Sequence, residues 1–501
     1  MKNLTWQNPE QLFVAQELIN KVKSKCCGIK VYNEWGYYED SRGQLTAKGE
    51  GTLSAGQLTI NAVLARDSSY RKIPTLINYA DKMRADNVTA NLYLQNQGYS
   101  NGQWHFISLP FDVKVSEIVP SNDTYWVIRR YDGAARAAGE TSATWVNLTN
   151  DDIMEAGKGY IISAVGGEQE INGYTTPCFA FTSGNSVTKN NLFRPTDIIV
   201  PLNEYAAEFA HNRSWNLIGN PYPCYFDMHY LNEEFTAPIT VWRNGSYVAY
   251  SPVDDNLVLN PFEAFFVQCP LDATEMTFKE TGRMHTSWRG SDEDNDEGVE
   301  SRTRVARMTE ERDVFNFEVK GENFADRARI VLNPEARADY EIGRDASKFF
   351  AEKSEGAQIY VAASVNYSID ERPVGNGLAT LGLRAQKEEK YTLSLSGRYC
   401  PEWSVIVTDN VTGKSVDLTR EDYTFTSAQG DAANRFAVKF VLKAETDNIN
   451  TITAAFGPDA HVTVTNTGGV TVYTGRLADV NVPAGIYIIS NGKETRKAIL
   501  K

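Results

Sequence analysis

The sequence lacks the features that mark a membrane-spanning or a disulfide-rich protein. No stretch of its 501 residues approaches the roughly 20 consecutive apolar residues that a bilayer-spanning helix needs. Its six cysteines are too dispersed for a disulfide framework or a zinc site of Cys-x-x-Cys type, and the adjacent Cys26 and Cys27 lie too close together to bridge each other easily. We therefore predict no transmembrane segment, no metal site and six buried thiols.

Signatures of catalysis are also missing. The five histidines are scattered, and no glycine-rich phosphate loop, nucleophile elbow or zinc-protease helix occurs. Cys224 with His211 and His229 is the one grouping that resembles a cysteine nucleophile with its base, but Cys224 follows a Pro-Tyr-Pro turn, which favours a structural role. The paired carboxylates of a glycoside hydrolase would meet only in the fold. The sequence thus predicts no catalytic residue and no cofactor.

Positive charge is scarce, since 50 Lys and Arg stand against 64 Asp and Glu for a net charge of −14. Nucleic acid is therefore not an expected partner, because phosphate binding depends on clustered Lys and Arg. Residues 291–305 begin with an acidic run and have no apolar periodicity, so we predict a linker there. Asp292, Asp294 and Asp296 alternate as in a calcium loop, but that loop would need glycine at Glu297 and glutamate at Thr303.

What the sequence does have is the composition of a folded, mainly β protein. It is 42% hydrophobic and 11% aromatic, and its length predicts three or four domains. Residues 1–30 are the exception, because residues 8–26 carry apolar side chains at helical spacing and predict an N-terminal amphipathic helix. Residues 31–99 contain short apolar runs separated by glycine at regular steps, which predicts a β-solenoid-like segment.

The N-terminal side of this solenoid-like segment would leave an open stacking edge, which needs a cap or further rungs. The predicted helix is one candidate cap, and missing upstream repeats are the other explanation. The first seven residues also contain no apolar core of a signal peptide. We therefore expect that the natural protein has further sequence before Met1.

Residues 100–290 contain an internal duplication. Trp104–Phe111 aligns with Trp215–Tyr222, 111 positions further on, and two more pairs of blocks follow in the same order. Those pairs are Trp126–Gly133 with Ile239–Gly245 and Gly157–Ile162 with Asn260–Val267. Three matching blocks in one order predict a repeated β unit.

Aromatic residues are frequent in this duplicated region, and some could form a stacking platform for sugars. The candidate ligand-binding residues are Trp145, Tyr250, Trp126 and Trp242. The alternative is that they belong to the core, because Trp104 and Trp215 occupy equivalent positions in the two blocks, as framework residues should. After the linker, residues 306–445 contain seven short β-type runs and predict a β-sandwich. These runs are Val314–Val319, Arg329–Leu332, Ile359–Ala363, Tyr391–Leu395, Ser404–Thr408, Tyr423–Thr426 and Arg435–Leu442.

The C-terminal residues 446–501 show an ordered series of strand and turn motifs. A glycine turn at Gly468 and Gly469 predicts a hairpin, and the break at Pro483 and Gly485 precedes an apolar run, Ile486–Ile489, that suits a strand buried on both faces. Asn491-Gly492 then turns the chain into a final lysine-containing strand.

This pattern resembles the C-terminal sorting domain of the type IX secretion pathway of Bacteroidetes. The matching positions are Gly468, Gly469, Pro483, Gly485, Tyr487, Lys497 and Lys501. The resemblance implies an immunoglobulin-like β-sandwich that the outer-membrane secretion machinery recognises and often removes. Residues 313–444 likewise resemble the spacer sandwich that commonly precedes such a domain, and the segment WNLIGNPYP resembles one common in Bacteroidetes surface proteins.

Together these patterns predict a non-enzymatic, secreted or cell-surface modular β protein with an adhesion role, binding a glycan or a host surface protein. One alternative is the accessory C-terminal portion of a secreted hydrolase whose catalytic domain lies upstream. A cytosolic protein is a third hypothesis, which depends on the missing signal peptide.

Overall fold

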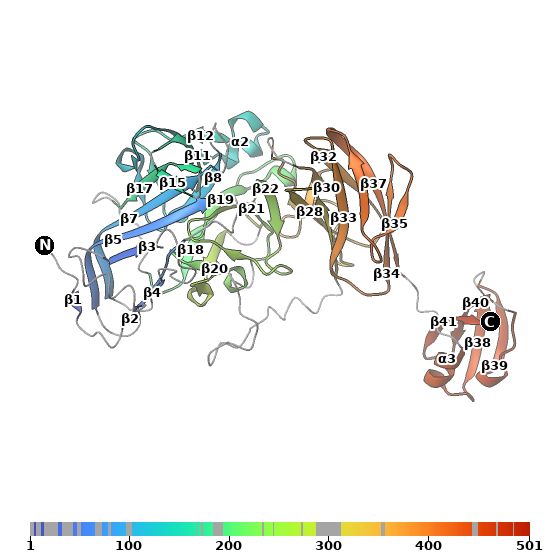
Figure 1. Cartoon of the computed structure of the whole chain (residues 1–501). Helices are drawn as coiled ribbons and strands as arrows, with labels where there is room; N and C mark the ends of the chain where they lie inside the picture. The colour runs from blue at the N-terminus through green and yellow to red at the C-terminus, as the bar shows by residue number, and fades with distance from the viewer. Residues whose placement is uncertain are drawn as a thin grey trace.

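The computed structural model shows a mainly β protein (Figure 1). It describes residues 5–6, 12–14, 29–32, 44–47, 52–65, 73–78, 82–96, 103–167, 169–171, 174–183, 194–232, 235–243, 245–271, 274–286, 312–351, 356–442, 449–466, 469–483 and 485–500. The predicted linker at 291–305, with its candidate calcium loop, lies outside these ranges, as do Cys26 and Cys27. No helix in the described ranges combines the length and apolarity that crossing a membrane requires.

The predicted N-terminal helix is wrong where it can be checked. Strand β2, Leu12–Val14, falls inside the predicted helical range and pairs antiparallel with β4, Gln44–Ala47. Three consecutive apolar residues fit a short strand as well as a helical stripe, so cross-strand pairing decides between them. Strand β1, Thr5–Trp6, is the other described element before residue 28, and the rest of the predicted helix lies outside the description.

The following segment contains strands stacked in parallel. Strands β5, Thr52–Ala65, and β7, Lys82–Gln95, run parallel with Leu58 opposite Val88. Strand β3, Ile29–Tyr32, pairs in parallel with β5, and β4 pairs in parallel with β6, Thr75–Asn78. This is the stacking expected of solenoid rungs, but β5 and β7 are longer than the short runs that the sequence predicted, with 14 residues each. In β5, Gly56 lies within the strand instead of ending it.

The duplicated region forms two four-stranded sheets with the same strand order. The first sheet has the order β12-β11-β14-β8 and the second β22-β21-β24-β19. The strands are β8 (His105–Ser108), β11 (Thr124–Tyr131), β12 (Trp145–Asn147), β14 (Gly159–Gly166), β19 (Trp215–Gly219), β21 (Ile239–Arg243), β22 (Ser246–Tyr250) and β24 (Ala264–Gln268). A shared order of equivalent strands supports the internal duplication.

The two units also contact each other symmetrically. Ile107 bridges to Glu263, and the equivalent pair, Ile218 and Lys158, bridges in the same way. Such reciprocal contacts are what a two-fold related pair of subunits makes, here within one chain. Phe262 has a φ of +60° where the first unit has Gly157 at +78°, so a bulky residue holds a conformation that favours glycine.

Residues 312–442 form the predicted sandwich-like β domain around one core. All seven predicted strands are present, as β27 (Asp313–Lys320), β28 (Ala325–Leu332), β30 (Gln358–Ala362), β33 (Glu389–Arg398), β34 (Trp403–Asp409), β36 (Tyr423–Ser427) and β37 (Gly430–Leu442). Four further strands complete the sheet, namely β29 (Ala346–Ser347), β31 (Asn366–Arg372), β32 (Leu378–Ala385) and β35 (Ser415–Asp417). Both sets line a core that includes Phe315, Leu381 and Phe436.

The C-terminal residues form one sheet covered by a helix, rather than the predicted immunoglobulin-like sandwich. Helix α3, Ile449–Phe456, is followed by β38 (His461–Asn466), β39 (Thr471–Arg476), β40 (Gly485–Ser490) and β41 (Thr495–Leu500), in the order β39-β38-β40-β41. Ile488 is 43% exposed, so β40 is not buried on both faces as predicted. The helix covers only one face, and alternate side chains of β40 therefore face solvent.

Candidate functional site

The two duplicated units meet through an aromatic cluster, which makes their junction the first candidate site. The buried centre of this cluster consists of Phe106, Ile161, Trp215, Leu217, Ala264 and Phe266. Trp242 stacks on Phe106 with ring centroids 5.8 Å apart, and Trp145 meets the same ring edge-on at 6.1 Å. Phe349, from the sandwich domain, stacks on Phe266 at 4.9 Å and so joins that domain to the cluster.

The four predicted ligand residues do not form one platform. Trp145 and Trp242 come together in the aromatic cluster and are half-buried there. Trp126 packs edge-on against Phe179 in the core of the first unit, at 5.5 Å. Tyr250 lies under the guanidinium of Arg327, at 4.9 Å. Each of the four rings therefore contacts other side chains of the protein.

Helix α2, Gly133–Ala137, lies against this junction. Asp132 caps it by accepting hydrogen bonds from the backbone N–H groups of Ala134 and Ala135. A Cβ atom at Gly133 would lie 2.2 Å from the carbonyl oxygen of Trp215, so only glycine permits this close approach. Arg136 covers the ring of Trp215, 4.8 Å from its centroid, and also donates to the Ser347 hydroxyl at 3.2 Å.

The loop before β19 is held by hydrogen bonds from buried side chains to its backbone carbonyls. The indole N–H of Trp215 donates to the carbonyl of His211 at 2.8 Å. The side-chain amide of Gln268 donates to the carbonyls of Ala210 and Arg213, at 2.6 and 2.7 Å. Tyr340, from the sandwich domain, donates in turn to the Gln268 side-chain oxygen at 2.8 Å. The loop, which includes the short 3-10 helix Ala210–Asn212, is therefore held in one geometry.

A shallow pocket of about 530 Å³ lies between the end of α2 and this loop. Its lining residues are Ala137, Ala138, Gly139, Ala206, Ala207, Glu208, Phe209 and Asn212. Phe209 is 55% exposed and stacks on His211 with ring centroids 5.7 Å apart. Sequence reasoning missed this pocket, because its residues come from the end of a short helix and from a loop, neither of which has apolar periodicity.

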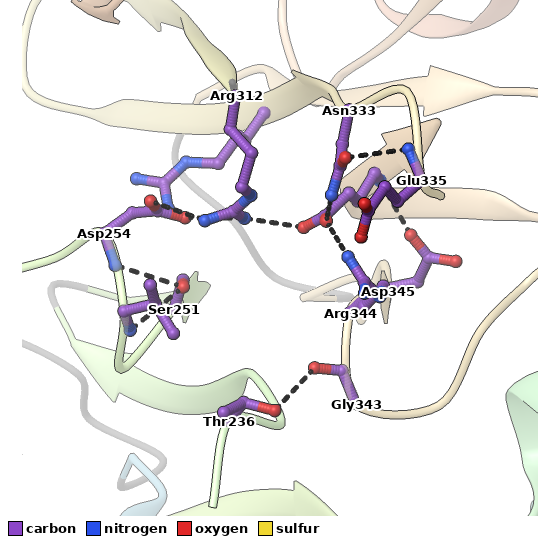
Figure 2. A network of polar contacts seen from close by, with 12 residues as sticks. Thr236, Ser251, Asp254, Arg312, Asn333, Glu335, Gly343, Arg344 and Asp345 are labelled. Carbon is purple, nitrogen blue, oxygen red and sulfur yellow. Dashed lines mark hydrogen bonds and ion pairs between the residues drawn. The ribbon is translucent and has the colours of Figure 1, made fainter. Parts of the chain in front are cut away.

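A second polar feature joins the second unit to the sandwich domain (Figure 2). Arg312 pairs with Asp254 at 3.2 Å and with Glu371 at 2.6 Å, and all three side chains are almost completely buried. Asp255, next in the turn, accepts from Arg329 at 2.6 Å and from Arg327 at 3.2 Å. We call these six residues the ionic joint.

The pKa values of the carboxyl groups in and beside the ionic joint are set by burial and by neighbouring charges. Burial alone would raise the pKa values of Asp255 and Glu371, but their arginine partners hold both below the usual range. Nearby Asp345 behaves in the opposite way, since burial raises its pKa well above normal and the neighbouring carboxylates Asp370 and Glu371 add to the effect. The joint therefore depends on ionised carboxylates at its centre.

The described cysteines are all free, and burial raises the pKa of three of them. The pKa of Cys224 is raised to about 12, so its thiol stays protonated at neutral pH and is a poor nucleophile. Cys178 and Cys269 are raised to about 11. Cys400 is exposed, which contradicts the expectation of a buried thiol there. No group of three potential metal ligands occurs in the part of the chain that the structure describes.

The residues matched to the sorting motif lie in turns and strands of the C-terminal unit. Gly469 has a φ of +78° in the turn of the hairpin formed by β38 and β39. The hydroxyl of buried Tyr487 donates to the carbonyl of Pro483 at 2.8 Å, which ties the break before β40 to the strand itself. Gly485 begins β40, and Lys497 lies opposite Ile488 on β41. Gly468 and Lys501 lie outside the described residues.

Comparison of this chain with protein-family models, with curated proteins and with solved structures finds no match in any of the three.

Proposed function

We propose that this chain is a non-enzymatic binding protein of the bacterial cell surface or medium, exported through its C-terminal unit. The outer-membrane secretion machinery would recognise residues 446–501 as an export signal of the type IX kind. The duplicated units and the sandwich domain would form the part that binds a glycan or a host surface protein. Binding would be passive, because no step of the proposal requires a reaction at the protein.

One observation carries the export part of this proposal, namely that the C-terminal unit has a hydrophobic core of its own. The buried core residues are Ile452, Val462, Val464, Leu477, Tyr487, Ile489 and Ala498. All of them come from within the unit, whose helix α3 and strands β38 to β41 lie together at the C-terminal end of the chain (Figure 1). A segment that buries its own apolar surface can fold when attached to a different protein, which an export signal must do.

The binding part is supported by its rigidity. The ionic joint and the contact of Phe349 with the aromatic cluster connect the sandwich domain to the duplicated units. A surface that is held in place before binding loses less conformational entropy when a partner docks.

A reporter fusion tests the export part. Residues 446–501 would be attached to a periplasmic reporter with its own signal peptide, in a bacterium that has this secretion pathway. We expect the reporter outside the cell, and a fusion without residues 446–501 in the periplasm. Tyr487→Ala, which removes a core ring and its bond to Pro483, should reduce export, whereas Thr474→Ala on exposed β39 should not. A reporter that stays in the periplasm with the segment attached would refute this part.

A further inference from the structure

We infer that the pocket between helix α2 and the loop before β19 is a binding site for one ring of a neutral sugar. This inference deepens the binding part of the proposed function, on which it rests. Its location differs from the four aromatic residues that the sequence indicated, because those rings are used in packing.

The size of the pocket fits a small ring. Its volume of about 530 Å³ falls in the range of roughly 300–1,000 Å³ that small-molecule sites occupy. Four alanines and a glycine are among its eight lining residues, so no long side chain from these positions fills the space. A ligand can therefore enter from solvent without displacing a protein group.

Phe209 supplies the surface on which a sugar ring would stack. Its side chain is 55% exposed. His211 covers part of the Phe209 ring at 5.7 Å, with the planes 28° apart, and so fixes its orientation. The apolar C–H face of a pyranose packs on such a ring, as apolar groups do on aromatic faces generally.

Two polar side chains beside Phe209 can bind sugar hydroxyls. Among the residues described, neither Glu208 nor Asn212 has a protein partner for its side chain, and both line the pocket. The amide of Asn212 can donate and accept, and the carboxylate of Glu208 accepts. Burial and the nearby Arg136 lower the pKa of His211, so this ring adds no positive charge at neutral pH.

The charge of the site selects the class of sugar. Glu208 places a carboxylate at the pocket, and the whole chain carries a net charge of −14. An acidic sugar would meet repulsion on both accounts. A neutral hexose or N-acetylhexosamine combines an apolar face with hydroxyl groups and meets no such repulsion.

The walls of the pocket are preorganised for this role. Helix α2 is held by the contact of Gly133 with Trp215 and by Arg136 over that ring, and the loop is held by Gln268. Rigid walls reduce the entropy that binding would otherwise cost.

Saturation-transfer NMR on the purified full chain tests the inference. The probes are lactose, chitobiose and mannobiose as neutral sugars, sialyllactose as an acidic one, and the capped dipeptide acetyl-Leu-Leu-amide as an apolar peptide. We expect at least one neutral sugar to bind more tightly than sialyllactose and the peptide. Phe209→Ala and Asn212→Ala should each weaken its binding roughly tenfold or more. Val411→Ala removes an apolar side chain of the sandwich domain that is 69% exposed, against 55% for Phe209, and should leave sugar binding unchanged.

Several results would overturn the inference. They are binding of no neutral sugar, binding that both pocket variants leave intact, or preference for the peptide over every sugar. Circular dichroism would confirm that each variant is folded, and Glu208→Gln offers a second pocket variant of nearly the same shape, which should remove the discrimination against sialyllactose. A chain that binds sugar independently of Phe209 would still be a binding protein, so this outcome separates failure of the pocket from failure of the proposed function.

Discussion

At the scale of single residues, Phe262 combines an unfavourable backbone conformation with a buried side chain. Its φ is +60°, and its ring is 1% exposed within the core of the first unit, although Phe262 belongs to the second. The structure accepts this conformation because the ring fills space across the junction. At the equivalent position, Gly157 meets no such penalty.

At position 262, glycine should give a more stable protein than alanine, which is the reverse of the usual order. Phe262→Ala loses the packing and keeps the strain, so it should destabilise the protein by about 3–5 kcal/mol. Phe262→Gly loses the same packing but relieves the strain, and should be more stable than the alanine variant by about 1 kcal/mol. Urea unfolding of both variants would measure the difference. If alanine were the better replacement, the strain at this position would be absent.

Gly133 provides a second prediction at this scale. Its missing side chain lets α2 touch the backbone of β19, so Gly133→Ala should overpack the junction and cost about 1–3 kcal/mol. Ala134→Ser, at an exposed position of the same helix, should have little effect. Thermal unfolding followed by circular dichroism compares the two, and equal melting temperatures would show that α2 can move away from β19 freely.

At the scale of elements, the ionic joint should be far more sensitive to substitution than an exposed ion pair. Removing one buried partner leaves the others uncompensated, so Asp254→Ala should destabilise by about 3–5 kcal/mol. The matched control is Arg420→Met, because Arg420 pairs with Asp417 while 71% exposed, and an exposed pair contributes about 0–1 kcal/mol. Chemical unfolding measures both, and a similar effect for the two would show that the joint contributes no more than a surface pair.

The ionic joint should also make the folding stability of the protein depend on pH. Asp255 and Glu371 have folded-state pKa values below those of the unfolded chain, so the unfolded chain takes up protons first as the pH falls. Their stabilisation is therefore complete above about pH 5 and is lost progressively below it. Asp345 has the opposite sign, since its raised pKa favours the folded state when it is protonated. Melting temperatures between neutral and acidic pH should fall in the wild type and fall less steeply in Arg312→Met, which removes a shared partner of the joint. Parallel pH profiles of the two proteins would contradict this assignment.

These elements also show which parts of the fold the sequence could predict. The order of blocks beginning at Trp104 and Trp215 predicted a repeated β unit, because side-chain alternation and repetition can be recognised in the sequence itself. The structure has two sheets with the same strand order. Asp254 and Arg312 are 58 positions apart, and nothing near either residue announces that they pair. The pocket at Phe209 could not be predicted either, since the end of α2 and the loop before β19 form it only after the units have packed. Local patterns therefore predicted strands, whereas the candidate site depends on contacts between distant segments.

At the scale of the whole molecule, the duplicated units and the sandwich domain should unfold together and the C-terminal unit should unfold by itself. The first two share the ionic joint and the aromatic cluster, whereas the C-terminal core is made entirely from its own residues. Differential scanning calorimetry of the full chain should therefore show a separate transition for the C-terminal unit. Removing residues 446–501 should abolish that transition and leave the midpoint of the other unchanged.

Phe349→Ala supplies the complementary test of this division. It removes the ring that the sandwich domain places on Phe266, so it should lower the midpoint of the larger transition, or split it in two, without changing the C-terminal transition. A C-terminal transition that shifted with Phe349→Ala, or a larger transition that shifted when residues 446–501 were removed, would mean that the units are energetically coupled. An export signal coupled in this way to its cargo would depend on the fold of that cargo, and residues 446–501 could not then direct an unrelated reporter out of the cell.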